Sequence, residues 1–155
     1  MRLTRFTDYG LRVLMVLASR TESLVTIADI SRAFDISEAH LMKVTHVLGQ
    51  TDWVETVRGR NGGMRLTGNP RALKLDTIVR RLEGDFALVE CLGEQSDNHC
   101  VLAGDCALEA ALVRATEAFF RELGKVSLAD LVSGSPALGK LAVWQPLTRR
   151  ARASP

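Results

Sequence analysis

The stretch from residue 26 to residue 67 restricts the possible folds more than any other part of the chain. Thr26 and Asp29 form a capping-box pattern, which predicts a short helix that ends at about Phe34. Ser37 is the expected N-cap of the next helix, because apolar residues recur after it at helical spacing. Two short helices joined by a tight link are typical of a helix-turn-helix.

A predicted β-hairpin follows these helices. Residues 53–57 are β-branched or aromatic except for Glu55, and residues 64–67 can form a returning strand. The loop between them reads Arg-Gly-Arg-Asn-Gly-Gly. The glycines allow a close approach to phosphate, and Arg58, Arg60 and Arg65 supply positive charge. A helix-turn-helix followed by a basic hairpin predicts a winged helix-turn-helix.

Three further helical patterns complete a mainly α fold with a small β-hairpin. We expect a deeply buried first helix with Thr7 as its N-cap, and a helix from about Leu75 that ends at Gly84. From Cys106, apolar residues at i, i+3 and i+4 spacing predict a helix of about 18 residues. A helix of that length with an apolar stripe needs a partner to cover it.

The distribution of charge points to a polyanionic partner for the N-terminal half. The chain has 155 residues, a net charge of +2 and 46% hydrophobic residues, which suits one compact domain. Residues 1–83 carry 13 Lys+Arg against 9 Asp+Glu, residues 84–132 carry 3 against 9, and residues 133–155 carry 4 against none. A basic half beside an acidic segment is consistent with binding to a nucleic acid.

Other classes of protein lack sequence support. No apolar run is long enough to span a membrane, and the N-terminus does not resemble a signal peptide, so we expect a cytoplasmic protein. The chain has no Walker loop, no G-x-S-x-G and no H-E-x-x-H, so we expect no enzyme activity. Duplex DNA is therefore the expected partner. Its predicted contacts are the polar face of the third helix and the hairpin loop, namely Ser37, His40, Lys43, Arg58, Arg60, Asn61, Gly62 and Gly63.

All three cysteines lie in one loop-like stretch. Eight residues separate Cys91 from Cys100, and five separate Cys100 from Cys106. An odd number of cysteines without an export signal favours metal ligands or redox groups over disulfides. A zinc site would need a fourth ligand, and His99 is badly placed beside Cys100. An iron-sulfur cluster tolerates such irregular spacing, whereas simple thiols remain the alternative interpretation.

The motifs Leu-Thr-Arg-Phe-Thr-Asp-Tyr-Gly-Leu-Arg at residues 3–12 and Val-Arg-Gly-Arg-Asn-Gly-Gly-Met-Arg-Leu at residues 57–66, with the three cysteines, carry a family resemblance. The chain resembles the Rrf-type winged-helix iron-sulfur transcriptional regulators, and among them most closely the nitric-oxide-sensing repressors. The resemblance covers residues 1 to about 133, including Ser-Leu-Ala-Asp-Leu-Val at residues 127–132.

This resemblance implies a homodimer formed through the long helix, with one cluster per subunit on Cys91, Cys100 and Cys106. The fourth ligand would be the partner's Asp8. From spacing alone, Asp8 and Arg12 form only an ordinary i, i+4 surface pair. The resemblance gives Arg12 the role of orienting the carboxylate and reporting its state to the DNA-binding unit. A relative that controls cluster assembly instead uses a histidine three residues after the third cysteine, and that position here is Glu109.

The expected organisation follows from these motifs. Residues 1–84 form the DNA-binding domain, residues 85–106 the cluster loop, residues 107–133 the dimerisation helix and a C-terminal segment, and residues 134–155 a flexible tail. The expected function is repression at a palindromic promoter, relieved by nitric oxide. We favour a 4Fe-4S cluster, with 2Fe-2S possible because the spacing between the first two cysteines is long. An iron-status or cluster-status sensor of the same family is the alternative, and a thiol switch or zinc protein that binds another protein is the alternative from a different class.

Overall fold

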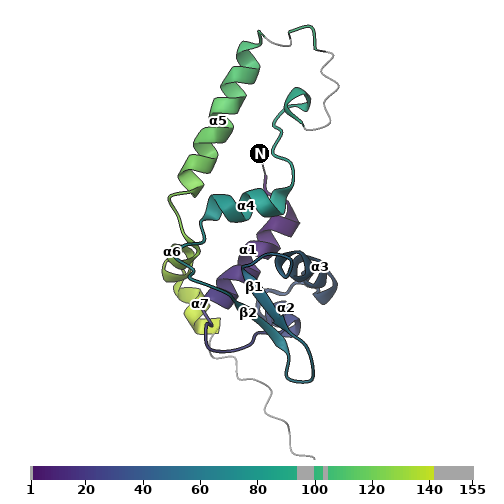
Figure 1. Cartoon of the computed structure of the whole chain (residues 1–155), viewed down its shortest axis with the longest axis vertical. Helices are drawn as coiled ribbons and strands as arrows, with labels where there is room; N and C mark the ends of the chain where they lie inside the picture. The colour runs from purple at the N-terminus through teal and green to yellow at the C-terminus, as the bar shows by residue number, and fades with distance from the viewer. Residues whose placement is uncertain (1, 94–99, 103–104, 142–155) are drawn as a thin grey trace, which may run out of the picture.

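The computed structural model describes residues 2–93, 100–102 and 105–141. It is mainly helical with one antiparallel two-stranded hairpin, which confirms the predicted fold class (Figure 1). In chain order the elements are α1 (Arg5–Ala18), α2 (Ile27–Phe34), α3 (Glu38–Leu48), β1 (Val54–Val57), β2 (Gly63–Leu66), α4 (Leu75–Glu83), the short 3₁₀ helix η1 (Glu90–Leu92), α5 (Ala107–Leu123), α6 (Leu128–Ser133) and α7 (Pro136–Lys140).

Side-chain caps set the starts of the first three helices. The expected cap of α2 is confirmed, since Thr26 and Asp29 form the full capping box, and Ser37 caps α3 by accepting the His40 N–H. The expected cap of α1 is wrong. The helix begins one turn earlier, where the Thr4 hydroxyl accepts the Thr7 N–H at 3.3 Å. The Thr7 side chain is instead completely buried, where its hydroxyl donates to Glu83.

The hairpin is fixed to the helix-turn-helix through its second strand. Val54 pairs with Leu66 and Val57 with Gly63, so residues 58–62 form the connecting loop. Met64 also makes an isolated bridge with Val25, with N···O distances of 2.8 and 2.9 Å in the two directions. Because Val25 directly precedes the cap of α2, this bridge holds the hairpin in a defined position beside the helix-turn-helix.

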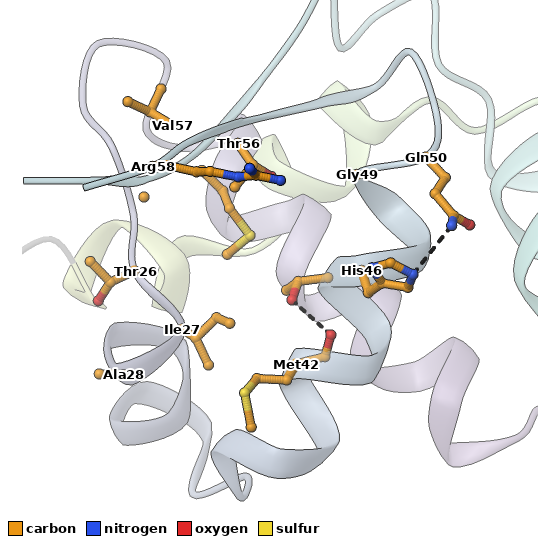
Figure 2. A pocket seen from close by; sticks show the side chains of 13 residues that line it. Thr26, Ile27, Ala28, Met42, His46, Gly49, Gln50, Thr56, Val57 and Arg58 are labelled. Carbon is orange, nitrogen blue, oxygen red and sulfur yellow. Dashed lines mark hydrogen bonds between the residues drawn. The ribbon is translucent and has the colours of Figure 1, made fainter.

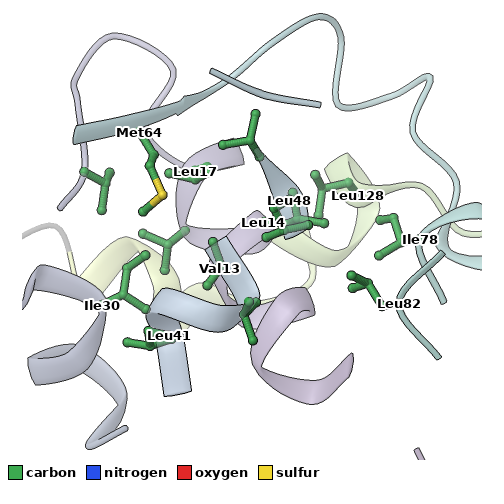
Figure 3. Close-up of a cluster of buried hydrophobic side chains, with 14 of the residues drawn as sticks. Val13, Leu14, Leu17, Ile30, Leu41, Leu48, Met64, Ile78, Leu82 and Leu128 are labelled. Carbon is green, nitrogen blue, oxygen red and sulfur yellow. The ribbon is translucent and has the colours of Figure 1, made fainter. Parts of the chain in front are cut away.

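Helix α1 lies at the centre of the hydrophobic core, where it contacts α3, α4, α6 and β2 (Figure 3). Leu14 and Leu17 of α1 have no exposed surface. Five large residues of α2, α3, α4 and α6 are also fully buried in this core, namely Ile30, Leu41, Leu48, Ile78 and Leu128. Because the core is closely packed, a displacement of α1 would also shift α3 and β2, which carry predicted DNA contacts.

Helix α5 extends away from this core, while the chain after it returns to the core (Figure 1). Phe120, near the end of α5, is its only buried residue, whereas Leu108 near its start is 62% exposed. Leu128 of α6 then enters the core. We expected residues 134–155 to be a flexible tail, but residues 136–140 form α7 and Leu138 is buried in the core, so the expectation is wrong for that stretch. The rest of the expected tail, residues 142–155, lies outside the described residues.

None of the helices in the described ranges has the length and apolar character needed to cross a lipid bilayer.

Candidate nucleic-acid interface and metal centre

The turn between α2 and α3 presents the polar face of α3 to solvent. Asp35 ends α2 in the left-handed conformation, with φ of 53°, and Ile36 anchors the turn in the core. Leu41 and Val44 fix the inner face of α3. The predicted contact residues Ser37, His40 and Lys43 are all exposed on the outer face. The structure therefore brings the three predicted residues of this helix onto one accessible surface.

The His40 ring is held at the start of α3 by two neighbours. Ser37 Oγ lies 2.8 Å from His40 Nδ1, and the Tyr9 ring of α1 lies 6.1 Å from the imidazole, centroid to centroid. One ring nitrogen is engaged, so Nε2 is the nitrogen that can address a base edge or phosphate. Tyr9 was not among the predicted site residues, because a contact between the first and third helices is not readable from spacing along the chain.

The wing loop is exposed, positively charged and tightly turned. Arg58, Arg60 and Asn61 are all exposed. Gly59 has a φ of 113°, which disfavours a side chain. A Cβ on Gly62 would lie 2.3 Å from the Val57 carbonyl oxygen, so this position requires glycine. The loop backbone can therefore approach a phosphate closely, as the sequence predicts.

Arg65 differs from the other two arginines of the hairpin. Its Nε donates to Glu55 Oε2 at 2.7 Å, across the two strands. This hydrogen bond and the charge of the carboxylate raise the pKa of Arg65. Within the described ranges, neither Arg58 nor Arg60 has an ion-pair partner. Arg65 therefore has its charge paired with Glu55, unlike Arg58 and Arg60.

A groove of about 700 Å³ separates α3 from the wing (Figure 2). Met42 and His46 of α3 line one side, Arg58 of the hairpin lines another, and Thr26 brings in the N-terminus of α2. The capping box already occupies the N-terminus of α2, and Ile27, Met42 and Met64 make much of the lining apolar. Arg58 is the residue of this groove that carries a positive charge suited to a phosphate.

The three cysteines lie along the segment between α4 and α5. Cys91 falls within η1, Cys100 is exposed, and Cys106 is the N-cap of α5, where its Sγ accepts the Glu109 N–H at 3.5 Å. All three are among the described residues, and none forms a disulfide. Within the described ranges, no three His, Cys, Asp or Glu side chains converge as a metal site, so the structure does not bring these cysteines and Asp8 of the same chain together. His99 lies outside those ranges.

Asp8 and Arg12 form a bidentate pair on α1. Arg12 Nε donates to Asp8 Oδ1 at 3.1 Å, and a terminal guanidinium nitrogen lies 3.0 Å from Oδ2. The guanidinium carbon of Arg12 also lies 5.5 Å from the centroid of the Phe34 ring, at the end of α2. The predicted pair is therefore connected to the helix-turn-helix. The sequence did not single out Phe34 as a neighbour of this pair.

Comparisons with known proteins agree with this architecture. The family model described as "Rrf2: Iron-dependent Transcriptional regulator" matches residues 3–134. The chain is 42% identical to the HTH-type transcriptional regulator NsrR of Bacillus licheniformis, over 91% of this chain and 99% of that protein. It is 44% identical to NsrR of Geobacillus kaustophilus, over 91% and 96% of the two chains.

A solved structure shares the fold. CymR, the global cysteine regulator of B. subtilis, superposes with a TM-score of 0.70 at 26% identity, over 86% of this chain and 97% of that one. The family match covers most of the chain, including both predicted DNA-contacting elements and all three cysteines. The chain belongs to the Rrf2 family of transcriptional regulators.

Proposed function

We propose that this protein is a homodimeric repressor that binds a palindromic promoter and senses nitric oxide through an iron-sulfur cluster. The observation that carries the proposal is the position of Arg12, which joins Asp8 to Phe34 at the end of α2. Asp8 is the residue that the family resemblance makes a cluster ligand. Relatives more than 40% identical bear the name NsrR. This is the name of the nitric-oxide-sensing repressors that the chain resembles, so it supports a response to nitric oxide.

The DNA-binding surface suits two half-sites in successive major grooves. Each subunit would place Ser37, His40 and Lys43 of α3 against base edges and phosphates. Arg58, Arg60, Asn61, Gly62 and Gly63 of the wing would lie on the flanking backbone. The groove between α3 and the wing separates these two contact surfaces, so one strand of phosphates can pass between them.

The dimer would form along α5. Leu108, Ala111 and Ala115 lie on one apolar stripe of this helix and are all exposed, and a contiguous exposed apolar surface marks an interaction site. A second copy of α5 would cover the same stripe by symmetry. The dimer would also supply the fourth cluster ligand. Within the described ranges Asp8 does not join the cysteines of its own chain in a metal site, so the ligand would come from the partner's Asp8.

The donor set fits an iron-sulfur cluster. Thiolates from Cys91, Cys100 and Cys106 are soft ligands, and Cys106 lies at the N-cap of α5. The partner's Asp8 would complete the set with a hard oxygen ligand, for a 4Fe-4S cluster or, less favoured, a 2Fe-2S cluster. When bound, the cluster supplies iron that nitric oxide can attack.

The coupling to DNA would run through Arg12. Asp8 is about half exposed, with 46% of its side-chain surface accessible, so its oxygens can be shared between Arg12 and an external ligand. A carboxylate engaged by a metal offers less charge to Arg12 than a released one. Release would therefore strengthen the Asp8–Arg12 pair and alter the contact of Arg12 with Phe34, one residue before the turn into α3. Such a difference between two states is what a switch requires.

The presence of a cluster is tested by anaerobic purification, an absorption spectrum, and iron and sulfide analysis. The proposal predicts a brown protein with equal iron and sulfide, and loss of both in the triple variant Cys91→Ser, Cys100→Ser, Cys106→Ser. A colourless protein that contains zinc would contradict it.

The origin of the fourth ligand is tested with mixed dimers. One chain carries Asp8→Ala with its cysteines intact, and the other carries the triple serine substitution with Asp8 intact. If Asp8 acts across the dimer, the mixed dimer holds one cluster as stable as that of the wild type. If Asp8 acts within its own chain, that cluster is as labile as in the Asp8→Ala homodimer.

An iron-status sensor is the second candidate, and the description of the matching family as iron-dependent favours it. The two candidate functions differ in the signal that releases the protein from its operator DNA. A sensor of nitric oxide loses operator affinity when nitric oxide is added at constant iron, whereas an iron sensor responds to iron depletion and not to nitric oxide.

A further inference from the structure

Glu83, the last residue of α4, accepts three hydrogen bonds from the first turn of α1. Its Oε1 accepts the Thr4 backbone N–H at 2.7 Å. Its Oε2 accepts the Thr4 hydroxyl at 2.9 Å and also the hydroxyl of Thr7. The carboxylate thus joins two segments that lie 76 to 79 residues apart in the sequence.

These bonds are of the strong kind. A carboxylate accepts hydrogen bonds more strongly than a neutral group does, and its negative charge is favourable at a helix N-terminus. Thr7 is completely buried, so its hydroxyl has no access to water as a replacement acceptor. Thr4 caps α1, so Glu83 holds both the capping residue and the first turn.

Glu83 also stands at the base of the cysteine segment. Gly84 follows it with a φ of 72°, a conformation that turns the chain out of α4. Phe86 then packs against Phe119 and Phe120 of α5, with ring centroids 5.6 and 4.7 Å apart. The junction that leads to Cys91 is therefore anchored on α1 by Glu83 and on α5 by Phe86.

Asp8 follows Thr7 directly, and its N–H donates to the Thr4 carbonyl at 3.0 Å. We propose that Glu83 is a positioning residue that holds the first turn of α1, and with it Asp8, in a fixed place beside the base of the cysteine segment. Asp8 then meets the cluster of the partner subunit already ordered, and little conformational entropy is lost when it binds. This inference rests on the proposed function, because it assigns Asp8 to that cluster.

The first part of the test uses apoprotein and needs no cluster. Amide hydrogen exchange of residues 5–8 is compared among the wild type, Glu83→Gln and Thr7→Ser. Glu83→Gln keeps the size of the side chain but removes its charge, whereas Thr7→Ser keeps the hydroxyl. We expect exchange about tenfold faster in Glu83→Gln, the size expected for a lost hydrogen bond to a charged group, and wild-type behaviour in Thr7→Ser. Glu122→Gln is the matched control, since Glu122 is an exposed glutamate at the far end of α5 that pairs with Lys125.

The second part measures iron release from the anaerobic holoprotein to a ferrous chelator. We expect about tenfold faster release in Glu83→Gln, approaching the rate of Asp8→Ala, with Thr7→Ser and Glu122→Gln unchanged. Unchanged amide exchange in Glu83→Gln would show that Glu83 does not hold the first turn of α1 in place. Faster exchange with unchanged iron release, while Asp8→Ala releases iron quickly, would overturn the positioning role and leave the proposed function intact. Slow release in Asp8→Ala would instead overturn the ligand role of Asp8 in the proposed function.

Discussion

Arg12 of α1 lies over the ring of Phe34 at the end of α2, with 5.5 Å between the guanidinium carbon and the ring centroid. The same guanidinium holds both oxygens of Asp8. A surface ion pair alone contributes little to stability. Here, however, the Arg12 side chain of the pair also contacts Phe34, which lies one residue before the turn into α3.

Arg12→Gln should uncouple the cluster from DNA binding. The substitution removes the bidentate pair and the contact with Phe34, so the ratio of operator affinities between holoprotein and apoprotein should fall by about tenfold, within the range typical of allosteric coupling. Fluorescence anisotropy with both forms measures this ratio. Arg71→Gln, at an exposed arginine before α4, is the control. A ratio identical to that of the wild type would rule out Arg12 as the link.

Lys43→Ala and Arg58→Ala should each weaken operator binding. If the lost contact is to a phosphate, the slope of log affinity against log salt should fall by about 0.9 for each substitution. Titrations at several salt concentrations measure the slope. Lys125→Ala serves as the control, because Lys125 lies just after α5 and pairs with Glu122. Full affinity in the double variant would show that α3 and the wing do not contact DNA.

Gly62→Ala should damage the wing without unfolding the protein. The new Cβ would lie 2.3 Å from the Val57 carbonyl oxygen, so the hairpin loop must change shape. We expect operator affinity to fall by roughly tenfold, about the effect of one lost contact, with a nearly unchanged thermal midpoint. Gly134→Ala, which has an ordinary φ of −77° and lies at the end of α6, controls for added bulk. Equal operator affinities in the two variants would argue against close approach of the loop to DNA.

Asp130 should give the stability of α6 a pH dependence. Hydrogen bonds from the hydroxyl and the N–H of Ser127 lower the pKa of Asp130 below its usual value near 3.8. Its contribution is therefore present above that usual value and is lost as the pH falls through the lowered pKa. Asp130→Asn should show a smaller loss of thermal midpoint between pH 7 and pH 3 than the wild type. Asp52→Asn changes an exposed carboxylate and should leave the difference as in the wild type.

Local signals were sufficient to predict the helix-turn-helix and the wing. The caps Thr26 and Ser37 act within three residues of their partners, so their effect is readable along the chain. The start of α1 was not readable in this way. Thr4 and Thr7 are both acceptable caps, and the choice depends on Glu83, which lies more than 70 residues away.

The site shows the same division between local and distant interactions. The exposure of Ser37, His40 and Lys43 follows from the helical spacing of the buried residues. By contrast, the pairing of Arg65 with Glu55 depends on strand register, and the contact of Arg12 with Phe34 depends on where the fold places α1 relative to the end of α2. A fourth cluster ligand from a second chain cannot be deduced from spacing within one chain.

The central claim is that nitric oxide releases the protein from DNA through a cluster that includes Asp8. Its most direct test is a titration of anaerobic holoprotein, bound to fluorescent operator DNA, with nitric oxide while anisotropy and absorbance are recorded together. We predict that DNA release follows the bleaching of the cluster, and that apoprotein on the same DNA gives no further response. Bleaching of the cluster with unchanged DNA binding would contradict the account.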